Sequence, residues 1–371
     1  MPDQSIPALP PDLHAASDHE RLAQDRIPPD VLAYIEGGSG QEVTLRRNRS
    51  AFSRHAILPR LLRSVGHGHT RSLLLGQEFD HPILLAPVAW QQLVHPHGEI
   101  DTARGASAMD TCMVLSTLSS CSLEDVAQHA NKRWFQLYWQ ASREHTLSLV
   151  RRAESAGYSA LVFTLDASVQ TPSLRAQRAG FRFPAGVRAV NLQDLPAIEL
   201  PPVDAGESAI FQGVMSTAPG WEDLRWLRHQ TTLPLLVKGV LREDDALRLR
   251  EIGVDAQIVS NHGGRALDGA PASLDRLPAL RHTLGADYPL LLDSGIRSGR
   301  DVFQAIALGA NAVLIGRLQL HALAVGGALG VAHLLRTLRE ELELCMAQTG
   351  CATLADITPD LLLKLNPEVS C

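Results

Sequence analysis

Short apolar segments of strand length recur along the chain, and the gaps between them each leave room for one helix. Residues 145–157 and 299–310 show this helical spacing, and both have a glycine at or near their ends. The alternation predicts a parallel sheet with right-handed helical crossovers. The apolar segments are 83–87, 113–117, 134–138, 160–166, 234–239, 256–261, 289–295 and 312–317.

Eight such units close naturally into a (β/α)₈ barrel, and a doubly wound open sheet is the competing architecture. Nearly every apolar segment ends C-terminally in a side chain that can do chemistry. Because barrel enzymes assemble their sites at that end of the strands, the pattern favours the barrel. These side chains are Gln136, Tyr138, Thr164, Asp166, Lys238, His262, Asp293 and Arg317.

The chain of 371 residues is expected to form one barrel domain over residues 26–371. Residues 1–25, rich in Pro, Asp and Ala, are expected to be a loosely attached arm. Residues 183–222 follow the fourth predicted strand and contain several prolines without a clean period. A long irregular insert at this rim predicts a lid over the active site.

Net charge, cysteine content and the absence of long apolar segments argue against several classes of protein. A net charge of -6 provides no basic field for nucleic acid. The five cysteines are an odd number without paired C-x-x-C spacing, so we expect reduced thiols and no metal site. We see no signal peptide and no segment near the roughly 18 apolar residues of a membrane span. These features predict a cytoplasmic protein without a membrane segment.

The last two predicted strands end in residues suited to a phosphate. Asp293, Ser294, Gly295 and Arg297 follow the seventh strand, while Gly316 and Arg317 follow the eighth. Small residues let backbone N–H groups approach an anion, and the loops after these strands are the usual phosphate site of barrels. Both arginines can add charge-assisted hydrogen bonds.

Lys238 closes a buried apolar strand, where an isolated ammonium group is costly. The anionic N1/C2 region of a reduced flavin would supply the charge partner that this lysine needs. The phosphate loops and Lys238 together therefore predict a flavin site.

The motif "SNHGGR", residues 260–265, follows the sixth predicted strand. His262 can serve as a general base because imidazole titrates near neutrality. Arg265 can hold a substrate carboxylate in a forked geometry. Asp166, at the end of the fourth strand, can orient His262 and stabilise its protonated form.

These motifs resemble the FMN-dependent 2-hydroxy acid oxidase and dehydrogenase family, which includes glycolate oxidase, lactate oxidase and mandelate dehydrogenase. The resemblance runs from about Pro28 to Gly350, and its motifs follow the family order. They are "YIEGGSGQEVTLRRNRSAF", "LLAPVAWQQLVHPHGE", "FQLYW", "LVKGVL", "SNHGGRALDGAP" and "LLDSGIRSGRDVFQAIALGANAVLIGR".

The resemblance implies a role for each matching residue. Asp166, His262 and Tyr138 are expected to be catalytic, and Tyr34, Tyr138 and Arg265 to bind substrate. Trp90 occupies a position near the flavin that varies with the substrate. The residues expected to contact FMN are Ala86, Pro87, Val88, Ala89, Ser116, Gln136, Thr164, Lys238, Ser260, His262, Gly263, Asp293, Ser294, Gly295, Arg297, Gly316 and Arg317.

The segment after the fourth strand departs from the family pattern D-x-P-x-x-G-x-R. Ser173 stands where the family has a second carboxylate-binding arginine. A lost charged hydrogen bond is worth roughly 1.5 to 3 kcal/mol. Arg175, two positions along, could point to the same side and replace it. Simple small acids therefore become less certain substrates.

Three smaller departures concern the pocket and the phosphate loop. Leu118 replaces a frequent aromatic residue, and Trp90 adds apolar bulk; together they predict a reshaped apolar pocket. Ser294 replaces a usual glycine, which we expect the loop to tolerate.

The expected reaction oxidises the α-carbon of a 2-hydroxy acid, one that can be bulky or aromatic, to a 2-oxo product. His262 takes a proton as the α-hydrogen leaves for flavin N5, either as a hydride or through a carbanion. Oxygen or another acceptor, such as a quinone or carrier protein, then reoxidises the flavin. The family usually forms homotetramers, which is the assembly expected here.

Two alternatives stay open. One is an oxidative decarboxylase or tailoring oxidase acting on a larger biosynthetic intermediate, since Ser173 removes one carboxylate contact. The other is an inactive flavin-binding scaffold, against which the retained Tyr138, Asp166, His262 and Arg265 argue.

Overall fold

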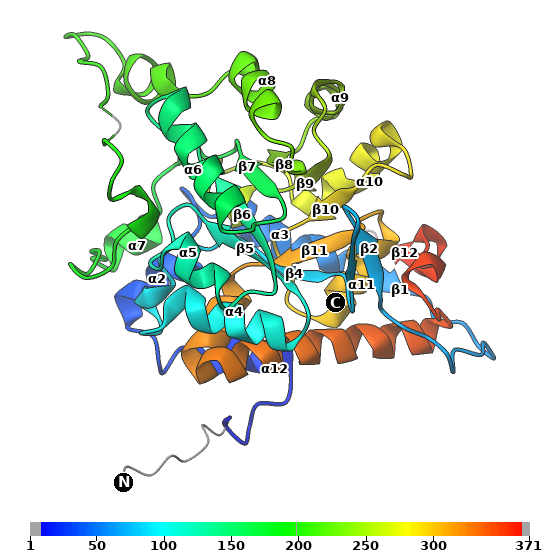
Figure 1. Cartoon of the computed structure of the whole chain (residues 1–371). Coiled ribbons are helices and arrows are strands. Elements are labelled where there is room, and N and C mark those ends of the chain that lie inside the picture. The colour runs from blue at the N-terminus through cyan, green and yellow to red at the C-terminus, as the bar shows by residue number, and fades with distance from the viewer. Residues whose placement is uncertain (1–8, 198, 366–371) are drawn as a thin grey trace.

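Eight parallel strands close into a barrel in the computed structural model, which describes residues 9–197 and 199–365 (Figure 1). Strand order around the barrel is β10-β11-β4-β5-β6-β7-β8-β9, with every neighbouring pair parallel. The predicted (β/α)₈ barrel is confirmed, and the open sheet is excluded. The strands are β4 (Ile83–Leu85), β5 (Cys112–Ser116), β6 (Lys132–Leu137), β7 (Leu161–Thr164), β8 (Leu235–Val240), β9 (Ala256–Val259), β10 (Leu290–Leu292) and β11 (Ala312–Ile315).

Helices surround the barrel, and several begin at a side-chain cap (Figure 1). Ser122, Ser142 and Ser298 each accept a hydrogen bond from a backbone N–H of the first helical turn. The helices are α1 (Ala16–Ala23), α2 (Pro29–Glu36), α3 (Val43–Ser53), α4 (Gly98–Ala108), α5 (Leu123–Ala127), α6 (Arg143–Ser155), α7 (Leu174–Arg178), α8 (Trp221–Gln230), α9 (Glu243–Ile252), α10 (Ser273–Leu284), α11 (Gly299–Ala307) and α12 (Arg317–Thr349).

The barrel interior is packed rather than hollow. Apolar side chains from alternate strand positions, such as Leu84, Val114 and Ile258, form one buried cluster inside it. The β2–β3 hairpin (Ser72–Leu74 and Gln77–Phe79) adds Leu74 and Phe79 to that cluster. Because this interior is filled, a site can form only at the rim of the barrel. A second short antiparallel pair joins β1 (His55–Ile57) to β12 (Leu362–Lys364).

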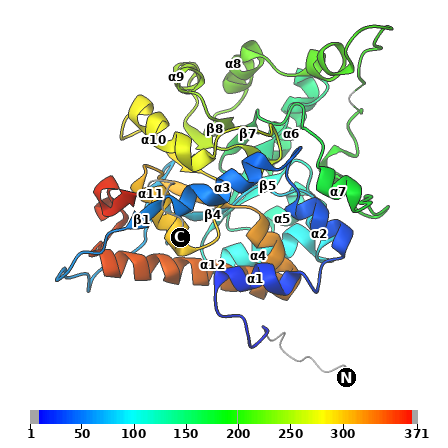
Figure 2. The ribbon, with the colours of Figure 1, turned by 180° about the vertical axis from the view of Figure 1, so that it is seen from behind.

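The predicted loosely attached arm is wrong for residues 9–25. Figure 2 shows α1 alongside α12, and Ala16, His19 and Ala23 of α1 are fully buried. The small apolar residues recur at helical spacing, so they bury against α12 instead of leaving the segment in solvent. Residues 1–8 of the predicted arm lie outside the described residues.

Helix α12 bears on the prediction that no segment has the length and apolar character of a membrane span. By length and composition this helix could cross a membrane, and the sequence pattern did not predict such a segment. However, 67% of its most apolar 18-residue stretch is buried inside the molecule. It packs against α1, α4 and α11, so its apolar character is explained by the protein core.

Residues 183–222, of which 198 is not described, run from α7 to α8 along the edge of the molecule (Figure 1). They contain three short helical turns, and most of their side chains are exposed. Asn191 anchors the segment because its side chain donates a hydrogen bond to Ser119 Oγ over 2.8 Å. The lid role of this segment stays a prediction.

Candidate active site

A cavity of about 750 Å³ opens at the C-terminal ends of the barrel strands. Its wall brings together residues that are far apart in sequence, which the barrel topology explains. Most of the predicted site residues line it. They are Tyr34, Ala86, Pro87, Val88, Ala89, Trp90, Ser116, Tyr138, Ser173, Lys238, His262, Gly263, Arg265, Asp293, Ser294, Gly295, Arg297, Gly316 and Arg317.

His262 and Asp166 form a hydrogen-bonded pair at this rim. The distance from His262 Nδ1 to Asp166 Oδ1 is 2.8 Å, and the Tyr138 hydroxyl lies 3.5 Å from His262 Nε2. Burial alone would raise the pKa of Asp166, but Lys238 and His262 outweigh it and lower that pKa below its usual value. Asp166 is therefore a carboxylate that can hold Nδ1 protonated and leave Nε2 facing the cavity.

Local backbone geometry aims the imidazole. His262 has a φ of 59°, in the left-handed region that side chains rarely adopt. Asn261 Oδ1 accepts the N–H of Gly264, and Ser260 Oγ accepts the N–H of His262. Ser260 is itself buried and does not line the cavity; it supports the loop from beneath.

Lys238 is buried among acidic and hydroxyl groups. Its Nζ lies 3.2 Å from Asp293 Oδ2 and 4.0 Å from Asp166 Oδ2, and it donates to Ser260 Oγ over 2.9 Å. Burial would lower the pKa of Lys238, but the two carboxylates outweigh it and raise that pKa above the usual lysine range. The lysine is therefore a fixed positive charge at the edge of the cavity.

Three buried polar atoms at the strand ends have no hydrogen-bond partner within the described part of the chain. These are Gln136 Nε2, Thr164 Oγ1 and Asp166 Oδ2. Since buried polar groups are normally hydrogen-bonded, these atoms are free to bond to a polar ligand placed near Lys238. The donors and acceptors fit the ring system of FMN, for which Gln136 and Thr164 were predicted.

The loop after β10 fits the phosphate end of the same ligand. Gly295 has a φ of 97°, and a Cβ there would lie 2.5 Å from the backbone oxygen of Asn48. Only glycine allows this close approach. Ser294 adopts a φ of 80°, and its hydroxyl donates to Asp293 Oδ1 and accepts the N–H of Gly263. These hydrogen bonds hold a serine where a glycine was expected.

Two cavity arginines bind the backbone after Tyr34. Arg265 Nη1 donates to the carbonyls of Tyr34 and Gly37, while Arg317 donates to those of Ile35 and Gly37. Burial, and then repulsion from Arg265, lower the pKa of Arg317 to about 9. An anion in the cavity would relieve this crowding of positive charge.

Arg297 has a partner that the sequence did not suggest. Its Nε lies 3.1 Å from Glu20 Oε2 of α1, the segment expected to be loose. No local pattern links residues separated by such a distance in sequence, so only the packing of α1 reveals the contact.

Arg175, which could have replaced the missing arginine, does not do so in this structure. Arg175 points to Glu42, with 2.5 Å between Nη2 and Oε2, and does not line the cavity. Its position in α7 turns it away from the strand ends, because the segment is helical rather than extended. Ser173 is the N-cap of α7, where its Oγ accepts the N–H of Ala176.

An aromatic wall closes the outer side of the cavity. Tyr34 stacks on Phe181 with ring centroids 4.3 Å apart, and Phe183 meets Trp90 edge-on at 4.6 Å. Phe181 and Phe183 were not predicted. The alternation "FRF" after Gly180 was the available signal, since it places both rings on one side of an extended segment.

Comparisons with known proteins show which family the chain belongs to. The family described as FMN-dependent dehydrogenase matches residues 23–364. An L-lactate oxidase of Alicycliphilus denitrificans is 58% identical over 355 residues, which cover 95% of this chain and 97% of that protein. A 4-hydroxymandelate oxidase of Amycolatopsis orientalis is 40% identical, covering 90% and 94%.

Solved structures show the same architecture. A mandelate oxidase variant with (S)-mandelic acid superposes with a TM-score of 0.86 at 38% identity, covering 95% of this chain and 98% of that one. Mandelate oxidase with benzoyl-formic acid has a TM-score of 0.85 at 38% identity, covering 94% and 97%. This chain belongs to the FMN-dependent 2-hydroxy acid oxidase family.

Proposed function

We propose that the protein oxidises an L-2-hydroxy monocarboxylic acid to the 2-oxo acid, with His262 as the base and oxygen as the final acceptor. The observation that carries this proposal is the Asp166–His262–Tyr138 arrangement at the cavity. In the net reaction, the substrate loses two electrons and two protons, and oxygen becomes hydrogen peroxide.

The acid–base step follows from the contacts of His262. Its Nε2 accepts the proton of the substrate hydroxyl, while Nδ1 keeps its hydrogen bond to Asp166. The carboxylate stabilises the imidazolium that forms. Burial raises the pKa of Tyr138 to about 12, so its phenol stays neutral and can donate a hydrogen bond to the substrate.

The surrounding side chains would bind the substrate and exclude water from it. Arg265 lines the cavity and can pair with the substrate carboxylate, because the carbonyls of Tyr34 and Gly37 hold its Nη1 in place. FMN, when bound near Lys238, Gln136 and Thr164, supplies the two-electron acceptor. Phe181 and Trp90 would shield the reacting carbon from solvent.

The substrate is proposed to carry an apolar side chain, with L-lactate as the first acid to test. Relatives named L-lactate oxidase support the small acid. The aromatic wall and Leu118 support acceptance of larger apolar groups such as the phenyl ring of mandelate. Ser173, which brings no charge, leaves Arg265 as the main carboxylate contact.

An anaerobic substrate panel tests this function. The FMN-loaded protein is mixed with L-lactate, D-lactate, glycolate or (S)-mandelate while visible flavin absorbance is followed. L-lactate and (S)-mandelate should bleach the flavin, and D-lactate should not. A flavin that none of the acids reduces would overturn the proposal.

Product analysis distinguishes the proposed oxidase from an oxidative decarboxylase. In air, the proposed oxidase yields one 2-oxo acid and one hydrogen peroxide for each oxygen consumed. Release of carbon dioxide in each turnover would favour oxidative decarboxylation instead.

A further inference from the structure

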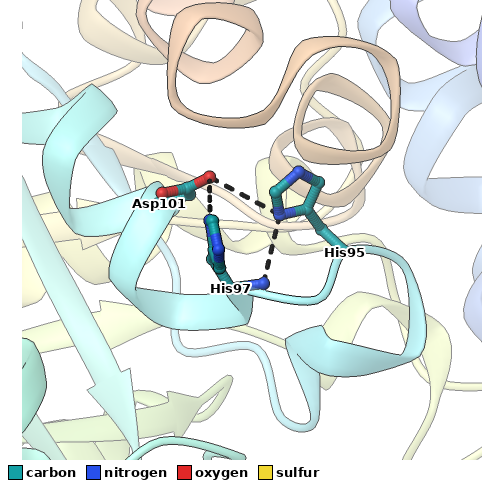
Figure 3. Close-up of side chains that lie close together, drawn as sticks. All are labelled: His95, His97 and Asp101. Carbon is teal, nitrogen blue, oxygen red and sulfur yellow. Dashed lines mark hydrogen bonds and ion pairs between the residues drawn. The ribbon is translucent and has the colours of Figure 1, made fainter. Parts of the chain in front are cut away.

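Two histidines and an aspartate converge in the loop between β4 and α4, outside the cavity wall (Figure 3). His95 and His97 follow the short helical turn Gln91–Leu93, and Asp101 lies in the first turn of α4. The proposed reaction does not use this grouping.

The distances between the three side chains match a metal site. Asp101 Oδ2 lies 3.2 Å from His97 Nδ1 and 3.5 Å from His95 Nδ1. In a tetrahedral site with metal–ligand distances of about 2.1 Å, neighbouring ligand atoms are about 3.4 Å apart. One candidate ligand atom from each residue lies within 4.8 Å of the other two. His95 Nδ1 accepts the backbone N–H of His97 over 3.3 Å, so this hydrogen bond would open when His95 binds the ion (Figure 3).

The surroundings orient the ligands and leave one side open. Arg104 Nη1 lies 2.9 Å from Asp101 Oδ1, which leaves Oδ2 directed at the imidazoles. The side chains of Asp101 and His95 are 10% and 23% exposed, whereas that of His97 is 63% exposed. A water molecule could therefore complete the coordination from the solvent side.

Helix α12 comes unusually close to the group at Gly327. Its φ of 54° interrupts the helix, and a Cβ there would lie 3.2 Å from both Asp101 Oδ2 and His95 Nε2. A side chain at this position would crowd both ligands, so the glycine keeps the space around them free.

We propose that His95, His97 and Asp101 bind a divalent transition-metal ion of the zinc class. Imidazole nitrogens with one carboxylate oxygen are ligands that Zn²⁺ favours, and Mg²⁺ prefers all-oxygen sites. The ion would tie the start of α4 to the loop that carries Trp90 of the cavity wall. No cysteine takes part, which is why cysteine spacing did not indicate this site.

Equilibrium dialysis of the FMN-loaded protein tests the site. After treatment with a chelator, the protein is dialysed against Zn²⁺ and bound metal is measured per chain. Wild type should bind one Zn²⁺ ion per chain. His97→Ala should bind Zn²⁺ at least about tenfold more weakly, because even the loss of a residue that only supports a ligand lowers metal affinity by about that factor. His282→Ala, which removes an exposed histidine on α10, should bind as wild type does.

Two further measurements separate the site from other effects. Zn²⁺ should raise the melting temperature of wild type and of His282→Ala, with little change for His97→Ala, and Mg²⁺ should not substitute. Because His97 is exposed, His97→Ala should keep the flavin content and circular dichroism of wild type. No Zn²⁺ binding by wild type, or equal binding by His97→Ala, would overturn the proposal.

Discussion

The strand ends and the loop after β7 contribute to the same cavity in different ways. At the strand ends, buried Lys238 and the partly buried Asp166 and His262 form a network of ion pairs and hydrogen bonds. In the loop, Ser173 caps a short helix and Arg175 pairs with Glu42 at the surface. From this difference we expect that changes at the strand ends alter the reaction, whereas changes in the loop alter the choice of substrate.

Burial explains this division. A charge inside the barrel needs a partner, so replacing one member leaves another uncompensated. In the loop, Arg175 is 44% exposed, and water can replace its partner at small cost. We therefore expect large effects from changes at the strand ends and smaller effects from changes in the loop.

The largest effect is expected for Lys238→Met. The change leaves Asp293 and Asp166 without their buried cation, which should cost about 3 to 5 kcal/mol of folding stability and weaken FMN binding. Chemical denaturation measures the loss of folding stability, and the flavin content of the purified protein measures FMN binding. Arg242→Met, which breaks an exposed pair with Asp244, is the control and should change folding stability little. Equal losses in both variants would contradict the comparison.

Asp166→Asn should lower kcat about a hundredfold, at the low end of what acid–base groups contribute. The amide can still hydrogen-bond to His262 but cannot stabilise the imidazolium. Steady-state kinetics with L-lactate measure the change, with the exposed Asp360→Asn as control. A variant that keeps more than about a tenth of kcat would show that Asp166 is not needed in this role.

We also expect the stability difference between wild type and Asp166→Asn to depend on pH. The pKa of Asp166 is lower in the folded protein than its usual value of 3.8. The stabilising contribution of the carboxylate is therefore present above pH 3.8 and is lost as pH falls through the folded-state pKa. The stability difference between wild type and Asp166→Asn should shrink in that acidic range and stay constant above it.

Ser173→Arg should have a moderate effect that sharpens the comparison. A second arginine facing the substrate carboxylate should lower KM for L-lactate about tenfold, because a charged hydrogen bond contributes roughly 1.5 to 3 kcal/mol. Ser168→Arg, at an exposed position of the same loop, should change KM little. No gain for Ser173→Arg on lactate, glycolate or mandelate would refute the account of the missing contact.

Arg175→Ala should have the smallest effect. Since Arg175 pairs with Glu42 rather than lining the cavity, kcat/KM should stay within about twofold of wild type. A tenfold or greater loss would mean that Arg175 reaches the substrate during turnover.

Much of the barrel was predictable because its signals are local. Each strand is a short apolar run, and residues such as Lys238 and His262 stand out because they end those runs. Helix α1 was misjudged because its buried residues are two alanines and a histidine between polar residues, which is a weak hydrophobic signal.

The site was less predictable where partners are distant in sequence. The contact of Arg297 with Glu20 and the carbonyls that hold Arg265 exist only once the chain has folded. The direction of the Arg175 side chain depended on whether residues 174–178 were helical or extended. Five residues without a clear hydrophobic period are too few to predict which conformation forms.

Rapid mixing of the FMN-loaded protein with L-lactate under anaerobic conditions, for wild type and His262→Gln, tests the central claim most directly. If His262 is the base, L-lactate should bleach the wild-type flavin, and the variant should react at least about a hundredfold more slowly with equal flavin content. Bleaching at the same rate in both proteins would contradict the account.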